Sequence, residues 1–460
     1  MKYDAIVIGS GQGGNPLAYR LADLGRSVAL IEEAQLGGTC INTGCTPTKT
    51  MVASAQVAYY ARQGARWGVE TGDVRVDLPA VVARKNKVVE FFRDGNEKRV
   101  SDRKTMHLYR THARFTGPHQ VDAGGESLES EQIFIDTGAR PRLPALDGLD
   151  QVPYLTNASI MELSAVPEQL LVIGGGYVGL EFGQMFRRFG SAVTVVDRGS
   201  LLMPHEDEDV AVELQKILEG EGIRFLLNSK PVRVRGAGGE ITLTVEKSAG
   251  AGTQNETLTG SHLLVATGRL PNTDALGLDR AGIEIYDRGY VKVNDRLETS
   301  VPGVWALGDV KGGPAFTHIS YNDYQIIYGN LVEKKNLSIR DRMVPYAVFT
   351  DPQLGRVGLT EKQARDAGRK LKIGKIPMTS VARARERDET AGLMKLVVDA
   401  VTDKVLGAAI LCTEGGEVVQ ILSTLMLADR PYTLLKGAIY IHPTLAEGFF
   451  ALMDSVKPVD

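Results

Sequence analysis

Two short apolar runs, each ending in glycines and followed by an amphipathic stretch, dominate the hydrophobic pattern of the chain. The run from Tyr3 reads YDAIVIG, and the run from Leu170 reads LLVIGGG. Unbroken β-branched and aliphatic residues over this length are typical of a strand buried on both faces of a parallel sheet. We expect a helix after each run, through Leu24 and Arg188, and then a second strand in SVALIEE and AVTVVD. The pattern therefore predicts two strand–helix–strand units of the same kind.

Each unit carries the spacing Gly-x-Gly-x-x-Gly where the strand turns into the helix. The glycines are Gly9, Gly11 and Gly14 in the first unit and Gly174, Gly176 and Gly179 in the second. The first glycine permits a tight turn, the second lets the backbone approach a pyrophosphate, and the third lets the helix pack on the strand. An acid follows eighteen residues later, Glu32 or Asp197, and can accept hydrogen bonds from a ribose diol. One such pattern is weak, but two with matching acids predict two bound dinucleotides.

Two further segments resemble each other. We expect them to be equivalent: in each, the chain would return from its strand–helix–strand unit. IFIDTGARP and LLVATGRLPN both read as a strand, then Thr-Gly, then Arg and Pro. We expect them to bind cofactor through Thr137, Gly138 and Arg140 in the first and through Gly268 and Arg269 in the second. A third segment, VWALGDV, ends a strand at Asp309, whose carboxylate could bind a polyol chain or could simply cap a turn.

Length, net charge, apolar runs and cysteine content restrict the classes of protein to which the chain can belong. The length of 460 residues suggests about three domains, and the formal net charge of −3 gives no reason to expect nucleic acid or an anionic membrane as partner. No apolar run approaches the ~18 residues of a membrane-spanning helix. The chain opens directly into MKYDAIVIGSG, without a signal-peptide pattern, and has only three cysteines. We therefore expect a protein of a reducing compartment, the cytoplasm.

Cys40 and Cys45 in GGTCINTGC are the main candidates for chemistry. Two thiols at this spacing can form a small-ring disulfide at the start of a helix, where the helix dipole favours a thiolate. A disulfide that opens easily is catalytic rather than structural. Two unconnected thiols that merely lie close are the alternative. Beside a dinucleotide unit, the pair predicts electron transfer between a dithiol and a redox cofactor.

Other residues have more than one interpretation. Lys49, four residues past Cys45, would share a helix face with it. His442 and Glu447 lie in IHPTLAEG, where Pro443 suits a helix start, and a histidine oriented by a carboxylate is a general acid or base near neutral pH. Cys412 lies in the apolar run VLGAAILC and is expected to be a buried, inert thiol.

Together these motifs resemble the flavoprotein disulfide reductases, which include glutathione reductase, dihydrolipoamide dehydrogenase and mercuric reductase. The match extends from GSGQGG to HPTLAEG. It implies an α/β protein with two doubly wound dinucleotide-binding domains and a C-terminal α+β dimerisation domain. FAD would bind residues 1–150 and NAD(P) residues 151–273. Residues 274–339 would return to the FAD domain, and residues 340–460 would form the dimerisation domain of a homodimer whose active site is shared between subunits.

The resemblance also assigns roles to individual residues. Cys45 would be the thiolate next to the flavin, and Cys40 the thiol that meets the acceptor. Lys49 would pair with Glu181 near flavin N5, because a buried lysine needs a carboxylate partner. Tyr177 resembles the tyrosine that covers the nicotinamide pocket, although a core aromatic is an equal alternative.

Further roles concern the cofactor and the partner subunit. The helix beginning at Thr317 and His318 would stabilise negative charge on reduced flavin through its dipole, with His318 itself structural. Thr39 joins the expected cofactor-binding residues. His442 would act on the active site of the partner subunit.

Within the family, GGTCINTGCTPTKT and AFTHISYNDY look closest to mercuric-reductase-like proteins and to the copper(II) reductases of reactive-chlorine resistance. The C-terminal sequence EGFFALMDSVKPVD lacks the cysteine pair of mercuric reductases, and His442 stands where they have tyrosine. Tyr19 and Gln325 stand where glutathione reductases use arginines, which disfavours glutathione. Dihydrolipoamide dehydrogenase shares the HPT…E ending and the arrangement of Gly313, Pro314 and His318.

The sequence thus predicts an FAD-dependent NAD(P)H oxidoreductase that passes electrons through Cys40 and Cys45 to Hg²⁺ or Cu²⁺, held transiently as substrate by these cysteines, or to a disulfide. We expect NADH to be preferred, because Asp197 would repel the 2′-phosphate of NADPH. Two alternatives stay open: a dihydrolipoamide dehydrogenase, and a redox sensor without catalytic function.

Overall fold

Two parallel sheets, one from each predicted unit, organise the N-terminal two thirds of the chain. The structure is a computed structural model that describes residues 1–249 and 252–459. The first sheet has the strand order β17-β7-β1-β2-β3. Its strands are β1 (Ala5–Ile8), β2 (Val28–Ile31), β3 (Met106–Tyr109), β7 (Ile133–Ile135) and β17 (Val304–Ala306). All four neighbouring pairs are parallel, and β17 adds a strand from a distant part of the sequence.

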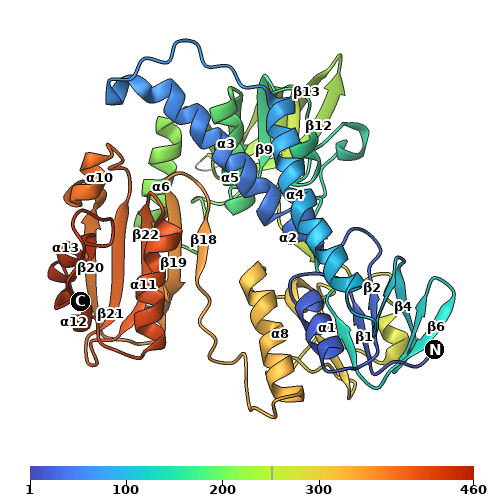
Figure 1. The fold of residues 1–460 in the computed structure, drawn as a ribbon. Coiled ribbons are helices and arrows are strands. Elements are labelled where there is room, and N and C mark those ends of the chain that lie inside the picture. The colour runs from blue at the N-terminus through green and yellow to red at the C-terminus, as the bar shows by residue number, and fades with distance from the viewer. Residues whose placement is uncertain (250–251, 460) are drawn as a thin grey trace.

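The helices of the first unit pack on this sheet and beside one another. Helix α1 (Gly14–Asp23) follows β1 directly and lies next to α8 (Thr317–Leu331) (Figure 1). After β2 come a short helix, α2 (Gly38–Asn42), and the long helices α3 (Cys45–Gln63) and α4 (Leu78–Ser101). Strands β4 (Ala113–Gly117), β5 (Gln120–Ala123) and β6 (Glu126–Glu129) form a small antiparallel sheet at the N-terminal side.

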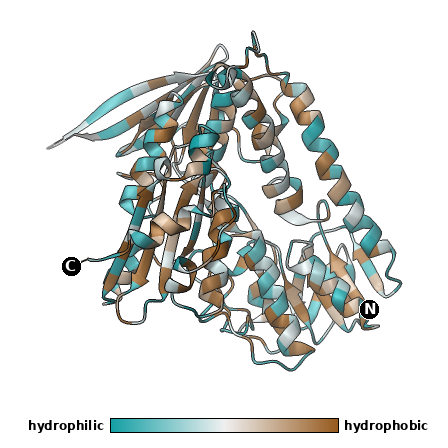
Figure 2. Cartoon of the chain, turned by 60° about the vertical axis from the view of Figure 1, so that its left-hand side comes forward, coloured by the Kyte–Doolittle hydropathy of each residue, from teal (hydrophilic) through white to brown (hydrophobic). Residues whose placement is uncertain are grey.

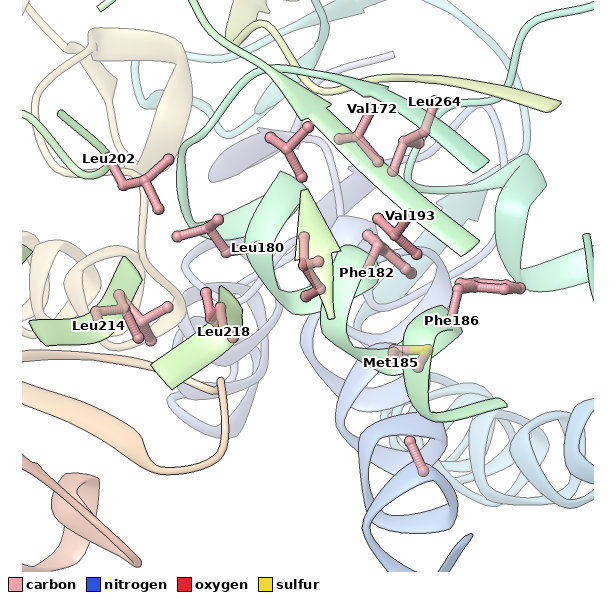
Figure 3. Close-up of a cluster of buried hydrophobic side chains, with 14 of the residues drawn as sticks. Val172, Leu180, Phe182, Met185, Phe186, Val193, Leu202, Leu214, Leu218 and Leu264 are labelled. Atoms are coloured by element: carbon pink, nitrogen blue, oxygen red, sulfur yellow. The ribbon is translucent and has the colours of Figure 1, made fainter. Parts of the chain in front are cut away.

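The second sheet repeats the first in the order β11-β10-β9-β15, again with parallel neighbours. Its strands are β9 (Gln169–Ile173), β10 (Ala192–Val196), β11 (Ile223–Leu226) and β15 (His262–Val265), and its helices are α5 (Tyr177–Phe189) and α6 (Glu208–Gly220). Side chains of α5, α6 and the sheet interlock in one core, which Figure 3 shows around Leu180, Phe186 and Val193. Burying such a face is the main force that holds an amphipathic helix on a sheet.

An antiparallel ribbon extends from the second unit. It consists of β12 (Ser229–Ala237), β13 (Glu240–Ala249) and β14 (Gly252–Gly260), and it projects from the body as a mostly hydrophilic arm (Figure 2). Elsewhere the two predicted returns meet: β8 (Ala139–Pro141) pairs antiparallel with β16 (Arg269–Pro271). Their resemblance in sequence thus corresponds to direct contact between the two units.

The C-terminal part is a six-stranded antiparallel sheet of order β18-β19-β22-β21-β20-β23 (Figure 1). Its strands are β18 (Tyr346–Val348), β19 (Gln353–Gly358), β20 (Leu371–Pro377), β21 (Leu393–Asp399), β22 (Val405–Cys412) and β23 (Lys457–Val459). Its helices are α9 (Glu361–Asp366), α10 (Ala382–Glu386), α11 (Gly415–Leu427), α12 (Thr433–Lys436) and α13 (Gly448–Asp454). Cys412 is fully buried, and burial raises the pKa of its thiol, as an inert core residue requires.

The predicted fold class is therefore confirmed: two parallel α/β units precede a C-terminal α+β part with an antiparallel sheet. One short helix, α7 (Leu278–Ala281), and single 3₁₀ turns complete the chain. In the described ranges, no helix combines the length and the apolar character needed to cross a bilayer.

Candidate active site

A cavity of about 1120 Å³ lies where the first unit meets the second unit and the C-terminal sheet. It is larger than the roughly 300–1000 Å³ usual for small-ligand pockets, so it has room for a dinucleotide. Most of the predicted site residues line it. They are Gly9, Gly11, Glu32, Thr39, Cys40, Cys45, Lys49, Thr137, Gly138, Tyr177, Glu181, Arg269, Asp309, Thr317 and His318.

The outer glycines of the two motifs are required by close backbone contacts. Gly9 has φ +98°, and a Cβ there would lie 2.3 Å from the carbonyl oxygen of Asp136; Gly174 has φ +115°, with the matching distance 2.4 Å to Ala266. These conformations and distances exclude any other residue. The third glycines are equally constrained, since a Cβ at Gly179 would lie 2.0 Å from the carbonyl oxygen of Gly174.

The middle glycines differ between the units. A Cβ at Gly176 would have no atom within 4 Å, so this position leaves open space in which a pyrophosphate could approach the backbone. A Cβ at Gly11 would instead lie 2.6 Å from the carboxylate of Asp136. Glycine at position 11 therefore makes room for a side chain of the protein itself, a reason that the motif alone does not indicate.

The two acids after the second strands brace the glycine loops. Glu32 Oε2 accepts hydrogen bonds from the backbone N–H of Ser10 at 2.9 Å and from its hydroxyl at 2.7 Å. Asp197 accepts the N–H of Gly175 at 2.6 Å with Oδ2 and that of Gly199 at 2.7 Å with Oδ1. These bonds fix the direction of each carboxylate, which a ribose-binding acid needs.

The two thiols are reduced here and hydrogen-bonded to each other. Cys40 lies in α2, and Cys45 is the first residue of α3, with its Sγ 3.2 Å from the hydroxyl oxygen of Thr317. The hydrogen bond from Cys40 lowers the pKa of Cys45 to about 6, with help from Thr317 and the charge of Lys49. The same bond and burial raise the pKa of Cys40. At neutral pH, Cys45 is therefore the thiolate and Cys40 keeps its proton.

Lys49 and Glu181 form an ion pair beside the dithiol. Lys49 Nζ lies 2.7 Å from Glu181 Oε2, and the Glu181 side chain is only 4 % exposed. Glu181 Oε1 also accepts the backbone N–H of Phe349 at 2.9 Å, and the ammonium lies 4.7 Å from the centre of the Phe349 ring. Both oxygens of the Glu181 carboxylate therefore have a partner, and the positive charge of Lys49 stays near the Cys45 thiolate.

A stack of three rings forms one wall of the cavity. The Phe316 ring lies between His318, with centroids 5.4 Å apart, and Tyr346, with centroids 5.3 Å apart. Tyr177, the first residue of α5, contacts the same phenylalanine with centroids 6.2 Å apart. The Tyr346 hydroxyl is hydrogen-bonded to the carboxylate of Glu206, which holds the outer ring in place. Tyr177 therefore lines the cavity and also packs against the hydrophobic core of the second unit.

Several residues that were predicted to bind cofactor help to hold together the two similar segments that meet where β8 pairs with β16. Arg140 lies outside the cavity, where it donates to the carbonyl of Pro271 at 2.8 Å and pairs with Asp274. Thr137 donates its hydroxyl to the carbonyl of Asn272 at 2.9 Å. Arg269 contacts both the other segment and the cavity: its Nη2 donates to the carbonyl of Ala139, and its Nε, buried without a hydrogen-bond partner, lies 3.7 Å from Asp309 at the cavity.

His442 and Glu447 are paired but lie away from this cavity. His442 Nδ1 is 2.8 Å from Glu447 Oε2, and the imidazole is 72 % exposed whereas the carboxylate is 13 % exposed. Ile439 and Ile441 beside it are also strongly exposed. The structure therefore presents an oriented imidazole on an apolar surface rather than inside the cavity of its own chain.

Asp136 and Tyr346 are among the residues of this site that were not predicted. Asp136 follows β7 and is enclosed by the first glycine loop, and Tyr346 anchors the ring stack. An acid directly after a buried strand was a usable signal for Asp136. Tyr346 has no local signal, because its role depends on Glu206 and Phe316, which are distant in sequence.

Two family models match the chain. The one described as pyridine nucleotide-disulphide oxidoreductase covers residues 3–323, and the one described as the dimerisation domain of pyridine nucleotide-disulphide oxidoreductase covers residues 344–452. Together they span the two parallel units and the C-terminal sheet.

Three similar proteins are named as three different kinds of oxidoreductase. The probable pyridine nucleotide-disulfide oxidoreductase RclA of Escherichia coli is 36 % identical, over 99 % of this chain and 100 % of that protein. A mercuric reductase of Lysinibacillus sphaericus is 34 % identical, over 97 % and 81 %. A dihydrolipoyl dehydrogenase of Thermus scotoductus is 36 % identical, over 99 % and 97 %. All three are similar over nearly the whole of this chain.

A solved structure shares the fold. The Cu(II) complex of the HOCl-induced flavoprotein disulfide reductase RclA from Escherichia coli superposes with a TM-score of 0.90 at 36 % identity, covering 99 % of this chain and 100 % of that one.

The contrast between Gly174 and Gly176 gives a first prediction. Gly174→Ala should lower the thermal unfolding midpoint, because it adds backbone strain of roughly 1–3 kcal/mol and a clash with Ala266. Gly176→Ala should leave that midpoint unchanged but raise KM for the nicotinamide dinucleotide, because its Cβ would enter the open space. A Gly176→Ala protein with normal KM would contradict the assignment of that space.

Proposed function

The chain belongs to the pyridine nucleotide-disulphide oxidoreductase family, and we propose that it is an FAD-dependent NAD(P)H oxidoreductase whose electrons leave through Cys40 and Cys45 to a thiophilic metal ion, Hg²⁺ or Cu²⁺, or to a disulfide. One observation carries this proposal: a dithiol with oppositely shifted pKa values opens into a dinucleotide-sized cavity. We further propose a cytoplasmic homodimer with small-molecule or metal-ion acceptors and no membrane or nucleic-acid partner.

The family implies FAD and NAD(P)H, and the residues present suit both. Gly176 leaves open space over the second glycine loop, and Arg269 Nε, which is ion-paired with Asp309 but has no hydrogen-bond partner, leaves a donor for an acceptor in the cavity. Glu32 and Asp309 line the cavity and would hold the ribose and the ribityl chain of FAD. FAD, when bound, carries electron pairs between the nicotinamide and the dithiol.

Side chains of the protein would determine the charge next to the dithiol and the access to the nicotinamide pocket. Lys49 keeps a positive charge beside the Cys45 thiolate, and Glu181 holds the lysine in position. Tyr177 lies on the second unit, where it would cover the nicotinamide pocket. Thr317, at the start of α8, would add the dipole of a helix N-terminus and a hydrogen bond to Cys45.

A disulfide acceptor requires proton transfer. Cys40 keeps its proton while Cys45 is a thiolate, so the partner subunit's His442 would accept that proton as a general base. The Cys40 sulfur then attacks the disulfide and releases one thiolate, which takes the proton from the imidazole. Cys45 next attacks the Cys40 sulfur, releases the second thiolate and restores the Cys40–Cys45 disulfide. The dithiol loses two electrons, and the acceptor gains two.

A metal acceptor also requires Cys40 to release its proton, so that both sulfurs bind the ion as thiolates, but no proton has to be delivered to a leaving thiolate. Two thiolates are preferred ligands for soft or borderline ions such as Hg²⁺ and Cu²⁺. One dithiol carries the two electrons that reduce Hg²⁺ to the metal, or two Cu²⁺ ions to Cu⁺. The similarity to a protein solved as a Cu(II) complex and to mercuric reductases supports this acceptor class. The similarity to a dihydrolipoyl dehydrogenase supports lipoamide as the second candidate.

The roles of the two thiols can be separated by absorbance. Two-electron reduction should give a broad long-wavelength flavin band that Cys45→Ser abolishes, whereas Cys40→Ser should show the band without reduction. The band should appear as pH rises through about 6, the pKa of Cys45, and vanish below it. Thr317→Val should move this midpoint to higher pH, because one hydrogen bond to the thiolate is lost. Cys412→Ala is the matched control, and opposite behaviour of the two mutants would reverse the roles.

The nicotinamide preference depends on Asp197. We expect kcat/KM for NADH to exceed that for NADPH by about tenfold or more, since the fixed carboxylate would repel a 2′-phosphate. Asp197→Asn should reduce this ratio. Arg198→Ala should increase it, because Arg198 is the neighbouring exposed cation. Equal or higher kcat/KM with NADPH in the unmodified protein would overturn the preference.

The acceptor can be identified by NADH consumption with Hg²⁺, Cu²⁺, lipoamide, glutathione disulfide and O₂. We expect modest metal-ion reduction that excess small thiol inhibits. His442→Ala should lower disulfide reduction by about 10²–10⁴-fold, the usual contribution of a general acid–base group, and lower metal reduction much less. Lipoamide turnover on the order of 100 per second without metal reduction would establish the lipoamide candidate instead. Negligible turnover with every acceptor would favour a redox sensor.

A further inference from the structure

Asp136 is a buried carboxylic acid enclosed by the first glycine loop. It is 6 % exposed and borders the cavity. A Cβ at Gly11 or Gly14 would lie 2.6 or 2.9 Å from Asp136 Oδ2, and a Cβ at Gly308 would lie 2.6 Å from Oδ1. Both carboxyl oxygens are therefore surrounded by backbone that has no side chain.

The carboxyl group takes a donor that a phosphate would otherwise use. Gly14 is the first residue of α1, and its N–H donates to Asp136 Oδ2 at 2.6 Å. N–H groups at such a helix start are those that bind phosphate in this type of unit. Within residues 1–249 and 252–459, no ion pair includes Asp136.

The surroundings of Asp136 are acidic. Glu32 directly after β2, Asp309 after β17 and Asp323 on α8 all act on it, and with burial as the main cause they raise the pKa of Asp136 well above its usual range. The nearby cations are engaged with other acids: Lys311 and Arg342 pair with Asp323, and Arg269 lies by Asp309. A negative charge at position 136 would thus have no compensating partner.

We propose that Asp136 is a neutral acid in the FAD-loaded protein and donates its proton in a hydrogen bond to the FAD diphosphate. This inference rests on the FAD site proposed above. A charged carboxylate inside the loop would repel the diphosphate, whereas the protonated form supplies an O–H donor in place of the Gly14 N–H that it occupies. Asp136 is then a cofactor-binding residue in addition to the glycines and Glu32.

The assignment makes FAD retention depend on pH. Where Asp136 is ionised in the FAD-free protein, binding FAD must also take up one proton, so the dissociation constant should rise by up to about tenfold per pH unit. Asp136→Asn keeps the shape, an acceptor for Gly14 N–H and an N–H donor, but it cannot ionise. Its FAD affinity should therefore hardly depend on Asp136-linked protonation.

The test follows flavin fluorescence as the holoenzyme releases FAD after dilution, between pH 6 and 9 at constant ionic strength. Release from the unmodified protein should increase by at least about tenfold over this range, and release from Asp136→Asn by less than about threefold. His112, His318 and Cys45 also border the cavity and are common to both proteins, so the difference isolates Asp136. Asp4→Asn, the same change at the exposed opposite end of β1, should keep the unmodified response.

Thermal midpoints of the FAD-free proteins at both pH values separate binding from folding. Equal pH responses of the unmodified and Asp136→Asn holoenzymes would overturn the inference and leave the proposed function intact. A protein that takes up no FAD at any pH would overturn the proposed function, and this inference with it.

Discussion

The carboxylate of Glu181 joins three parts of the chain at one point. It projects from α5 of the second unit, pairs with Lys49 on the dithiol helix α3, and accepts the N–H of Phe349 at the C-terminal sheet. Removing one partner of a buried ion pair typically costs about 3–5 kcal/mol, because the remaining charge is uncompensated. The relative placement of the dithiol, the second unit and the C-terminal sheet therefore depends on keeping this one charge paired.

Local pattern was sufficient to predict much of the fold. The strands after Tyr3 and Leu170 and the helices behind their glycines were predictable because each apolar run, turn and amphipathic stretch is contiguous in sequence. The pairing of Lys49 with Glu181 was different: it followed only from the family resemblance, since no local pattern connects residues 132 positions apart.

What could not be predicted depends on contacts between distant segments. Arg140 occupies an expected cofactor position, yet its guanidinium binds the return strand of the other unit, because β8 and β16 pair with each other. Tyr346 belongs to the cavity wall only because Glu206 reaches it from the second unit. In each case nothing in the neighbouring sequence distinguishes the side chain, and only the fold determines which residues it contacts.

The helices that carry the two thiols differ in how firmly they are held. Cys45 begins α3, a helix of 19 residues that packs against α4 and α5 along its length. Cys40 lies in α2, which has only five residues, begins at Gly38 and lies between Gly37 and Gly44. Short helices between glycines move at lower energetic cost than long packed ones. Opening and closing the dithiol should therefore displace mainly the Cys40 sulfur. Under the proposed roles, the thiol that would reach the acceptor is on the more mobile segment, and the thiol that would keep its distance from the cofactor is on the more rigid one.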